Sequence, residues 1–404
     1  MNDNINHIRY GPLNRKTPNG TLLACGIKPS SVQDGVYNYT HIISTPTTEV
    51  KKSKVYTLPG SKSGREHLIA VEAEKDNIME YTEDNTIDFS SVGWLIQNLA
   101  KEKDKLSTVK SLGPQLDIFN SVKMQILLNR ASLKMLNINE AFNNIIGDAT
   151  KKMFRFADLC CAPGGFTYTL QKLRYKNLIE AKLFTMHEIG TFLPVDDSIK
   201  TIDNVSIFYG DICNKHDRDT FFYSFADKVD FVLSDGGIDF TGQENKQEFY
   251  SQKLYISQTL LGLKILKPEG FMICKFFDTF LAASVNLLYA LNLCFDEMKV
   301  CKIISSKSGN AEKYILFNKY KPNIEIIEFL DDVITNDKVI KFNDVNHKEY
   351  KAFKNYISHI NKILGVEQLA ALKKYTGTNK IPLPKNHHQQ NLRHNYIRSW
   401  LSHF

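Results

Sequence analysis

The sequence predicts an α/β fold in which helices cover both faces of a mostly parallel, seven-stranded sheet. Seven short apolar runs lie between residues 154 and 320, and amphipathic stretches separate most of them. Strands that alternate with helices indicate a parallel sheet, because each parallel connection needs a long crossover. Two of these runs also carry an acid near their end and lead into Gly-Gly, as expected where a ligand meets a sheet.

The seven expected strands are FRFADLC (154–160), AKLFTMH (181–187), VSIFYGD (205–211), VDFVLSD (229–235), GFMICKFF (270–277), EMKVCKII (297–304) and EKYILFNKY (312–320). Helical patterns cover residues 243–266 and 279–293 between them. The link between the last two strands is short and lacks a helix. That last pair is therefore predicted to be antiparallel.

Composition divides the 404 residues into three predicted parts. Residues 1–105 are richer in Pro, Gly, Ser and Thr, so short strands and turns are expected there, with the charged stretch KEKDK (101–105) at the junction. Residues 106–325 form the core domain, and a helical stretch over 117–146 leads into its first strand. Residues 326–404 are expected to be a helical extension with a basic C-terminal tail.

Composition also excludes several classes of protein. With 43% hydrophobic and 24% charged residues, the chain can bury a sizeable core. It has no apolar run long enough for a membrane span and no signal-peptide core, so we expect a nuclear or cytoplasmic protein, virion-associated if viral, that is not secreted. Its seven cysteines form no CxxC pair or zinc-type cluster, so no metal site is predicted and a reducing compartment is expected.

The charge pattern is most uneven at the C-terminus. The net charge is +7, and no acid follows Glu367. The basic and aromatic residues of this tail are Lys373, Lys374, Tyr375, Lys380, Lys385, Arg393, Tyr396, Arg398 and Trp400. Such a tail suits contact with nucleic acid, and it suits equally an extension that its aromatic residues pack onto the protein.

The stretch FADLCCAPGGFTYTLQKL (156–173) joins a buried strand to a helix through a turn with almost no side chains. Gly164 and Gly165 lack the Cβ atoms that would block a ligand, and Asp158 precedes them near the strand end. An acid in this place commonly binds a ribose hydroxyl or an ammonium group. The alternative is an ordinary tight turn.

Four charged residues in the core also need an explanation. Asp235 ends a strand and precedes Gly-Gly, Lys275 lies inside an apolar strand, Glu312 starts the last strand, and Lys134 lies in a helix before the first. A buried lysine is costly unless it is paired or used. Each residue alone is explained by a sheet edge that reaches solvent, but the set points to a catalytic site.

These motifs carry a family resemblance. DLCCAPGGF, SDGG, the strand lysine and the later glutamate resemble the FtsJ-type Rossmann-fold methyltransferases and their Lys-Asp-Lys-Glu tetrad. The segments LLNRASLKMLNIN, DGGIDFTGQENKQE, GFMICKFFDTF and NAEKYILF are similar to those of eukaryotic and viral mRNA cap 2′-O-methyltransferases. The resemblance covers about residues 120–320 and implies methylation, by S-adenosyl-L-methionine, of a ribose 2′-hydroxyl next to the 7-methylguanosine cap.

Carried over by position, the resemblance makes Lys134, Asp235, Lys275 and Glu312 the catalytic residues. The 2′-hydroxyl is a poor nucleophile, so Lys275 is expected to take up its proton. Burial beside Lys134 would lower the pKa of Lys275, whereas the carboxylates of Asp235 and Glu312 would raise it. The sequence leaves the net shift to the geometry.

The resemblance also implies the binding residues. The cofactor residues are Asp158 near the methionine amino group, Ala162, Pro163, Gly164, Gly165 and Phe166 under the methionine half, Asp211 at the adenine amino group, and Asp235. Glu188 is the candidate for binding the cofactor ribose, and the alternative is an exposed loop glutamate. Glu244 and Asn245 are the candidates for the cap guanine, although Glu244 also suits a helix N-terminus.

The expected partner is capped mRNA, with other capping enzymes or RNA polymerase as further candidates. Two alternatives to cap methylation stay open: a ribosomal or transfer RNA 2′-O-methyltransferase, which would modify RNA without a cap, and a non-catalytic methyltransferase-like subunit of a capping complex. A dinucleotide-dependent dehydrogenase is disfavoured, because the chain has APGG and no GxGxxG motif.

Overall fold

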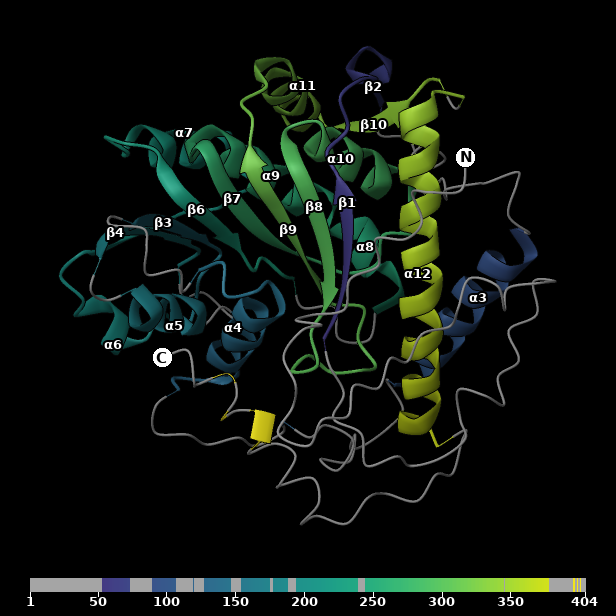
Figure 1. The fold of residues 1–404 in the computed structure, drawn as a ribbon, viewed down its shortest axis with the longest axis horizontal. Helices are drawn as coiled ribbons and strands as arrows, with labels where there is room; N and C mark the ends of the chain where they lie inside the picture. The colour runs from purple at the N-terminus through teal and green to yellow at the C-terminus, as the bar shows by residue number, and fades with distance from the viewer. Residues whose placement is uncertain are drawn as a thin grey trace.

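The structure is a computed structural model, and it describes residues 53–72, 89–106, 127–146, 154–174, 177–187, 194–238, 244–344 and 346–377, with single positions 119, 395, 396, 398 and 400. Its centre is an eight-stranded sheet with the order β1-β8-β9-β7-β6-β3-β4-β5 (Figure 1). The strands are β1 (Lys54–Pro59), β3 (Phe154–Leu159), β4 (Leu178–Thr185), β5 (Val205–Tyr209), β6 (Val229–Ser234), β7 (Leu266–Phe276), β8 (Phe295–Lys302) and β9 (Lys313–Tyr320).

All seven strands expected from the sequence are present, and β1 adds an eighth from the N-terminal region. Strands β7, β6, β3, β4 and β5 run parallel to one another, whereas β9 runs antiparallel to both β7 and β8. The predicted antiparallel last pair is therefore confirmed. β1 pairs antiparallel with β8 at the edge of the sheet.

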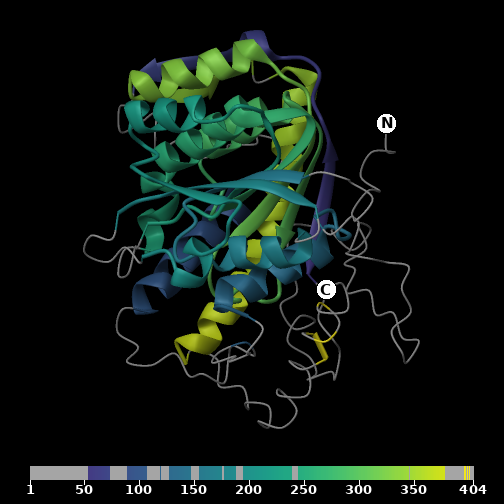
Figure 2. The ribbon, with the colours of Figure 1, turned by 90° about the vertical axis from the view of Figure 1, so that its left-hand side faces the viewer.

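Helices cover both faces of the sheet (Figures 1 and 2). On one face lie α4 (Arg130–Ala141), α5 (Gly165–Arg174) and α6 (Asp197–Lys200), and on the other lie α7 (Lys215–Tyr223), α9 (Gln252–Ile265), α10 (Ala282–Asn292) and α11 (Ile324–Thr335). Alternate residues of β7 point to opposite faces of the sheet. Met272 packs with α9, and Phe271 packs on the face that α4 and α5 cover. This is the period of two that a doubly covered strand requires.

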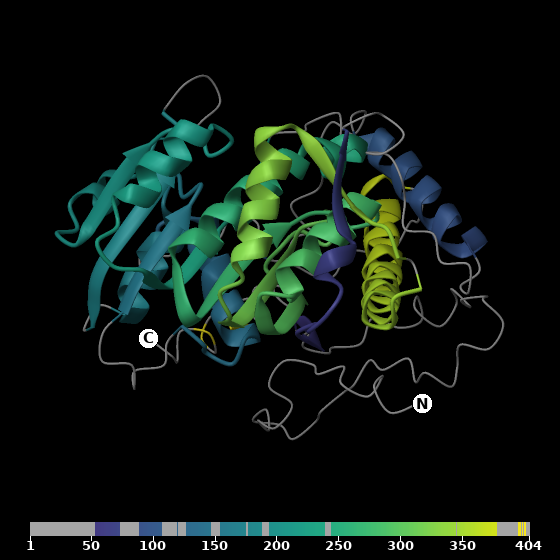
Figure 3. The same ribbon diagram turned by 90° about the horizontal axis from the view of Figure 1, so that it is seen from above.

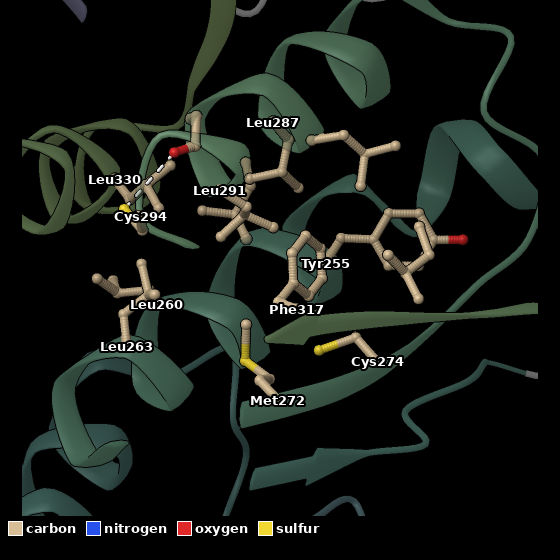
Figure 4. Close-up of a cluster of buried hydrophobic side chains, with 14 of the residues drawn as sticks. Tyr255, Leu260, Leu263, Met272, Cys274, Leu287, Leu291, Cys294, Phe317 and Leu330 are labelled. Atoms are coloured by element: carbon tan, nitrogen blue, oxygen red, sulfur yellow. Dashed lines mark hydrogen bonds between the residues drawn. The ribbon is translucent and has the colours of Figure 1, made fainter. Parts of the chain in front are cut away.

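The larger core lies between the sheet and helices α9, α10 and α11. Figure 4 shows Tyr255, Leu260 and Leu263 of α9 facing Met272 and Cys274 of the sheet. The labelled residues are almost fully enclosed, which fixes the register of α9 and α10 on the strands.

The N-terminal and C-terminal parts pack together beside this core. β2 (Leu68–Glu72) follows the short 3₁₀ helix η2 (Arg65–His67) and pairs antiparallel with β10 (Lys338–Phe342) in a second sheet. The long α12 (Lys348–Tyr375) lies beside α3 (Phe89–Leu106), as Figures 1 and 3 show. Within the described residues, no helix is long and apolar enough to cross a bilayer.

Two local expectations are corrected here. Residues 89–106 form the 18-residue helix α3, where short strands and turns were expected, and KEKDK lies inside that helix. Leu95 and Leu99 of α3 are buried against α12, so a contact distant in sequence stabilises a helix that the local composition did not indicate. Similarly, the region after residue 325 contains strand β10 as well as helices.

The tail aromatics are used for packing. Tyr396 and Trp400 are buried against Phe119, Leu133 and Leu136, and the rings of Trp400 and Phe119 stack with centroids 5.4 Å apart. These two rings are therefore not available to stack on bases, which supports the packing interpretation of this part of the tail. Lys380, Lys385 and Arg393 lie outside the described residues.

Candidate active site

The topology brings the four predicted tetrad residues to one edge of the sheet. Asp235 follows β6, and Lys275 lies at the end of the adjacent parallel strand β7. β9 runs antiparallel to β7, so its start lies beside the end of β7, and Glu312 immediately precedes that start. Lys134 approaches from α4. The carboxyl edge of a parallel sheet is where α/β proteins bind their ligands.

The tetrad forms two pairs. The Lys275 Nζ donates to the Asp235 backbone carbonyl at 2.7 Å and lies 3.2 Å from its Oδ1, and the Tyr314 hydroxyl donates to the same Oδ1 at 3.0 Å. The Lys134 Nζ donates to the Glu312 Oε2 at 2.7 Å. All four side chains are at least four-fifths enclosed. The pairing of residues 178 positions apart shows that the site is assembled by the fold.

The structure determines the direction in which the pKa of Lys275 shifts. Burial favours its neutral form, but the charges of Asp235 and Glu312 outweigh burial and raise the pKa of Lys275 above its ordinary value. The geometry thus decides the net shift that the sequence left open, because two carboxylates lie close to this amine. Burial likewise opposes ionisation of Glu312, but Lys134 and Lys275 hold the pKa of Glu312 down at about 2.

Helix α4 is fastened to the glycine turn. The side chain of Asn129 caps α4 by accepting from the Ala131 and Ser132 amides at 2.9 and 3.2 Å. The Ser132 hydroxyl donates to the Gly165 carbonyl at 2.9 Å, and a Cβ at Gly165 would collide with the Asn129 side chain. Gly165 thus lets α4 approach closely, and this contact sets the position of Lys134 relative to the turn.

The glycine turn itself has the features of a ligand site. Gly164 has φ of +102°, a conformation that favours glycine. Asp158 is fully buried, and its Oδ2 accepts from the Thr167 hydroxyl at 2.6 Å, while its Oδ1 has no hydrogen-bond partner among the described residues. Burial raises the pKa of this carboxyl to about 7. A buried acceptor without a partner, beside a bare backbone, fits an ammonium-bearing ligand.

The other predicted cofactor residues differ in how far they are exposed. Ala162 and Pro163 are partly exposed in the turn, whereas Phe166 is buried and contacts the Tyr314 ring edge-on at 6.1 Å, so it links the turn to β9. Asp211 is exposed after β5, and its Oδ1 accepts from the Cys213 amide at 2.8 Å. Glu188 lies outside the described residues.

The predicted cap residues begin the 3₁₀ helix η4 (Glu244–Lys246), which precedes α8 (Gln247–Tyr250). Glu244 is half-buried in this helix. The Asn245 amide donates to the Ala100 carbonyl at 3.2 Å and also binds Asp104, so Asn245 holds η4 against α3. The structure therefore gives Asn245 a packing role.

Sequence reasoning missed two groups of residues near the site. Lys302 and Lys313 end β8 and begin β9 within apolar runs, and the rule that singled out Lys275 would have found them. His187 and Tyr209 follow or end the neighbouring strands β4 and β5, and their exposed rings stack with centroids 5.0 Å apart. No sequence spacing predicts that stack, because it depends on strand pairing.

One protein family matches the part of the chain that contains this site. Residues 127–320 match the FtsJ-like methyltransferase family. That segment contains all four tetrad residues and the glycine turn. It begins just before α4 and ends with β9, so it excludes β1, α3 and α12.

Relatives with assigned functions include proteins named cap-specific mRNA (nucleoside-2′-O-)-methyltransferase 1. The Drosophila melanogaster protein is 29% identical over 70% of this chain, and the Homo sapiens protein is 29% identical over 51% of it. This chain spans 40% of the fly protein's length and 28% of the human protein's length.

Proposed function

We propose that this protein transfers a methyl group from S-adenosyl-L-methionine to the ribose 2′-hydroxyl of a nucleotide next to the cap of mRNA. The observation that carries the proposal is the placement of two lysine–carboxylate pairs beside the glycine turn and the unsatisfied Asp158. The names of the relatives supply the substrate. Other capping enzymes or RNA polymerase are candidate partners that the sequence resemblance implies.

The residues of the turn fit the cofactor. Asp158 would accept a hydrogen bond from its ammonium group, and the bare backbone of Gly164 and Gly165 would allow close approach. Asp211 would accept a hydrogen bond from the adenine amino group. When bound, this cofactor supplies a sulfonium methyl group that is open to attack by an oxygen nucleophile.

The tetrad would orient the ribose and take up the proton of its 2′-hydroxyl. In its neutral form the Lys275 amine would accept the proton of the 2′-hydroxyl, which makes the ribose oxygen a better nucleophile. Asp235 fixes the position of that amine through two contacts, and Tyr314 fixes the Asp235 carboxylate. Glu312 and Lys134 form the second pair, a charge-assisted hydrogen bond in which the two charges neutralise each other.

The raised pKa of Lys275 has a direct kinetic consequence. The amine is protonated in the free protein at neutral pH, so it must lose a proton to solvent before it can accept one from the ribose. Below the pKa, the fraction of active enzyme rises about tenfold with each pH unit. The reaction is thus expected to be base-dependent.

The test is methyl transfer from labelled S-adenosyl-L-methionine to short RNAs that differ only in a 5′ 7-methylguanosine cap, followed by nucleoside analysis. Label in a 2′-O-methyl nucleoside of the capped RNA alone is expected. Lys275→Met should abolish transfer, whereas Lys299→Met, which breaks an ion pair with Glu297 on β8, is the matched control. Equal labelling of uncapped RNA would favour a ribosomal or transfer RNA enzyme, and no labelling of either RNA would overturn the proposal.

A further inference from the structure

The loop between β8 and β9, residues 303–312, carries the tetrad glutamate at its end, and we call it the Glu312 loop. Lys302, the last residue of β8, lies at its base. The Lys302 Nζ donates to the Glu312 backbone carbonyl at 2.7 Å, to the Asn310 carbonyl at 2.8 Å and to the Asn310 Oδ1 at 2.7 Å. A fourth oxygen, the Lys307 carbonyl, lies at 3.4 Å. One amino group thus joins both ends of the loop.

The four contacts require the amino group of Lys302 to be protonated. All four atoms are oxygens, an ammonium has three hydrogens to donate, and a neutral amine has only two and a lone pair. Burial lowers the pKa of Lys302 to about 7. The charged groups that face it are Glu312, Lys313 of β9, Lys134 of α4 and Asp278 after β7. Loss of the proton therefore leaves a lone pair directed at a carbonyl oxygen.

We propose that Lys302 is a positioning residue that holds Glu312 in place for the tetrad. It fixes the backbone of Glu312 at the point where the side chain must reach Lys134, whose Nζ lies 2.7 Å from the Glu312 Oε2. With Lys302 uncharged, the loop loses one of its three short contacts, and the direction of the Glu312 carboxylate is no longer fixed from the sheet side. This role rests on the proposed function, since it concerns the same tetrad.

The outer side of the Glu312 loop is held independently by α12. The Gln368 Nε2 donates to the Gly309 carbonyl at 3.2 Å, and the Ser308 and Tyr375 hydroxyls lie 3.0 Å apart. A Cβ at Gly309 would collide with the Tyr375 ring. Loss of Lys302 should therefore leave the loop docked on α12 but loosened at its Asn310–Glu312 end.

The first experiment measures hydrogen exchange of the Glu312 loop in the free protein from pH 6 to pH 9, corrected for the intrinsic pH dependence of exchange. In wild type, protection over residues 310–313 should fall as the pH passes the pKa of Lys302. In Lys302→Met protection should be low at every pH, and in the control Lys299→Met it should follow wild type. Asn310→Asp places a carboxylate beside Lys302, so the transition should move to higher pH. Protection of residues 310–313 that is equal in wild type and Lys302→Met at every pH would overturn the proposal.

The second experiment measures methyl transfer. Lys302→Met should lower kcat about tenfold or more, the effect of losing a hydrogen bond from a charged group, with an unchanged KM for the cofactor. Wild-type kcat with unchanged KM in this variant would overturn the positioning role alone. If wild type methylates no RNA, the proposed function fails, and the exchange data still decide whether Lys302 holds the loop. If Lys302→Met does not fold, the test is made with Asn310→Asp, in which protection of residues 310–313 should fall at a higher pH than in wild type.

Discussion

Replacing Asp158 with asparagine is expected to stabilise the free protein at high pH and to weaken its binding of S-adenosyl-L-methionine. Asp158 is fully buried, and burial raises its pKa from 3.8 to about 7. The folded state therefore holds a proton that the unfolded chain releases above pH 4. Between these two values, stability falls as the pH rises, because folding must take that proton back up.

The magnitude follows from the two pKa values. Their difference of about three units corresponds to about 4 kcal/mol at high pH. About 2 kcal/mol of this is already lost at pH 5, and most of the rest, about 2–3 kcal/mol, is lost between pH 5 and pH 8. Asparagine has no such titration, so the stability of Asp158→Asn relative to wild type should increase by that second amount between the two pH values.

The assay is urea unfolding of both proteins at pH 5 and pH 8, with Asp197→Asn, at an exposed position of α6, as the control. Calorimetry at pH 8 should show weaker cofactor binding by Asp158→Asn, because the amide carries no charge to pair with an ammonium group. A relative stability that does not change with pH would refute the reasoning about burial. Unchanged cofactor affinity would refute the assignment of Asp158 to the ammonium group.

The rate of methyl transfer should rise about tenfold per unit between pH 5.5 and pH 6.5, because the raised pKa of Lys275 keeps its amine protonated; a flat rate there would argue against that base. Lys134→Met leaves Glu312 buried without its 2.7 Å partner, so unfolding free energy should fall by about 3–5 kcal/mol at pH 7. The loss should be smaller at pH 4, where Glu312 in the variant can be protonated, and an equal loss in urea unfolding at both values would contradict the pairing. Gly237→Ala would place a Cβ 2.9 Å from the Lys275 Nζ, so methyl transfer should fall with little change in melting temperature. An unaltered rate would show that Lys275 tolerates displacement from Asp235.

The sequence by itself determined the strands and the bare turn. Strands such as Val229–Ser234 follow from short apolar runs, and the turn at Gly164 and Gly165 follows from the absence of side chains. These are local properties, since hydrophobic periodicity and backbone freedom act within a few residues. The identities of the tetrad residues came from a resemblance of motifs, and the fold brings those residues to one edge of the sheet.

Only the tertiary structure decided the charges of the site and the use of the flanking regions. The pKa of Lys275 is raised because the attraction of the nearby Asp235 and Glu312 carboxylates outweighs the effect of burial. No spacing in the sequence gives the distances between these groups. Helix α3 and the burial of Trp400 likewise depend on partners far along the chain. Coulomb and packing energies fall steeply with separation in space, so they become definite only when the fold sets that separation.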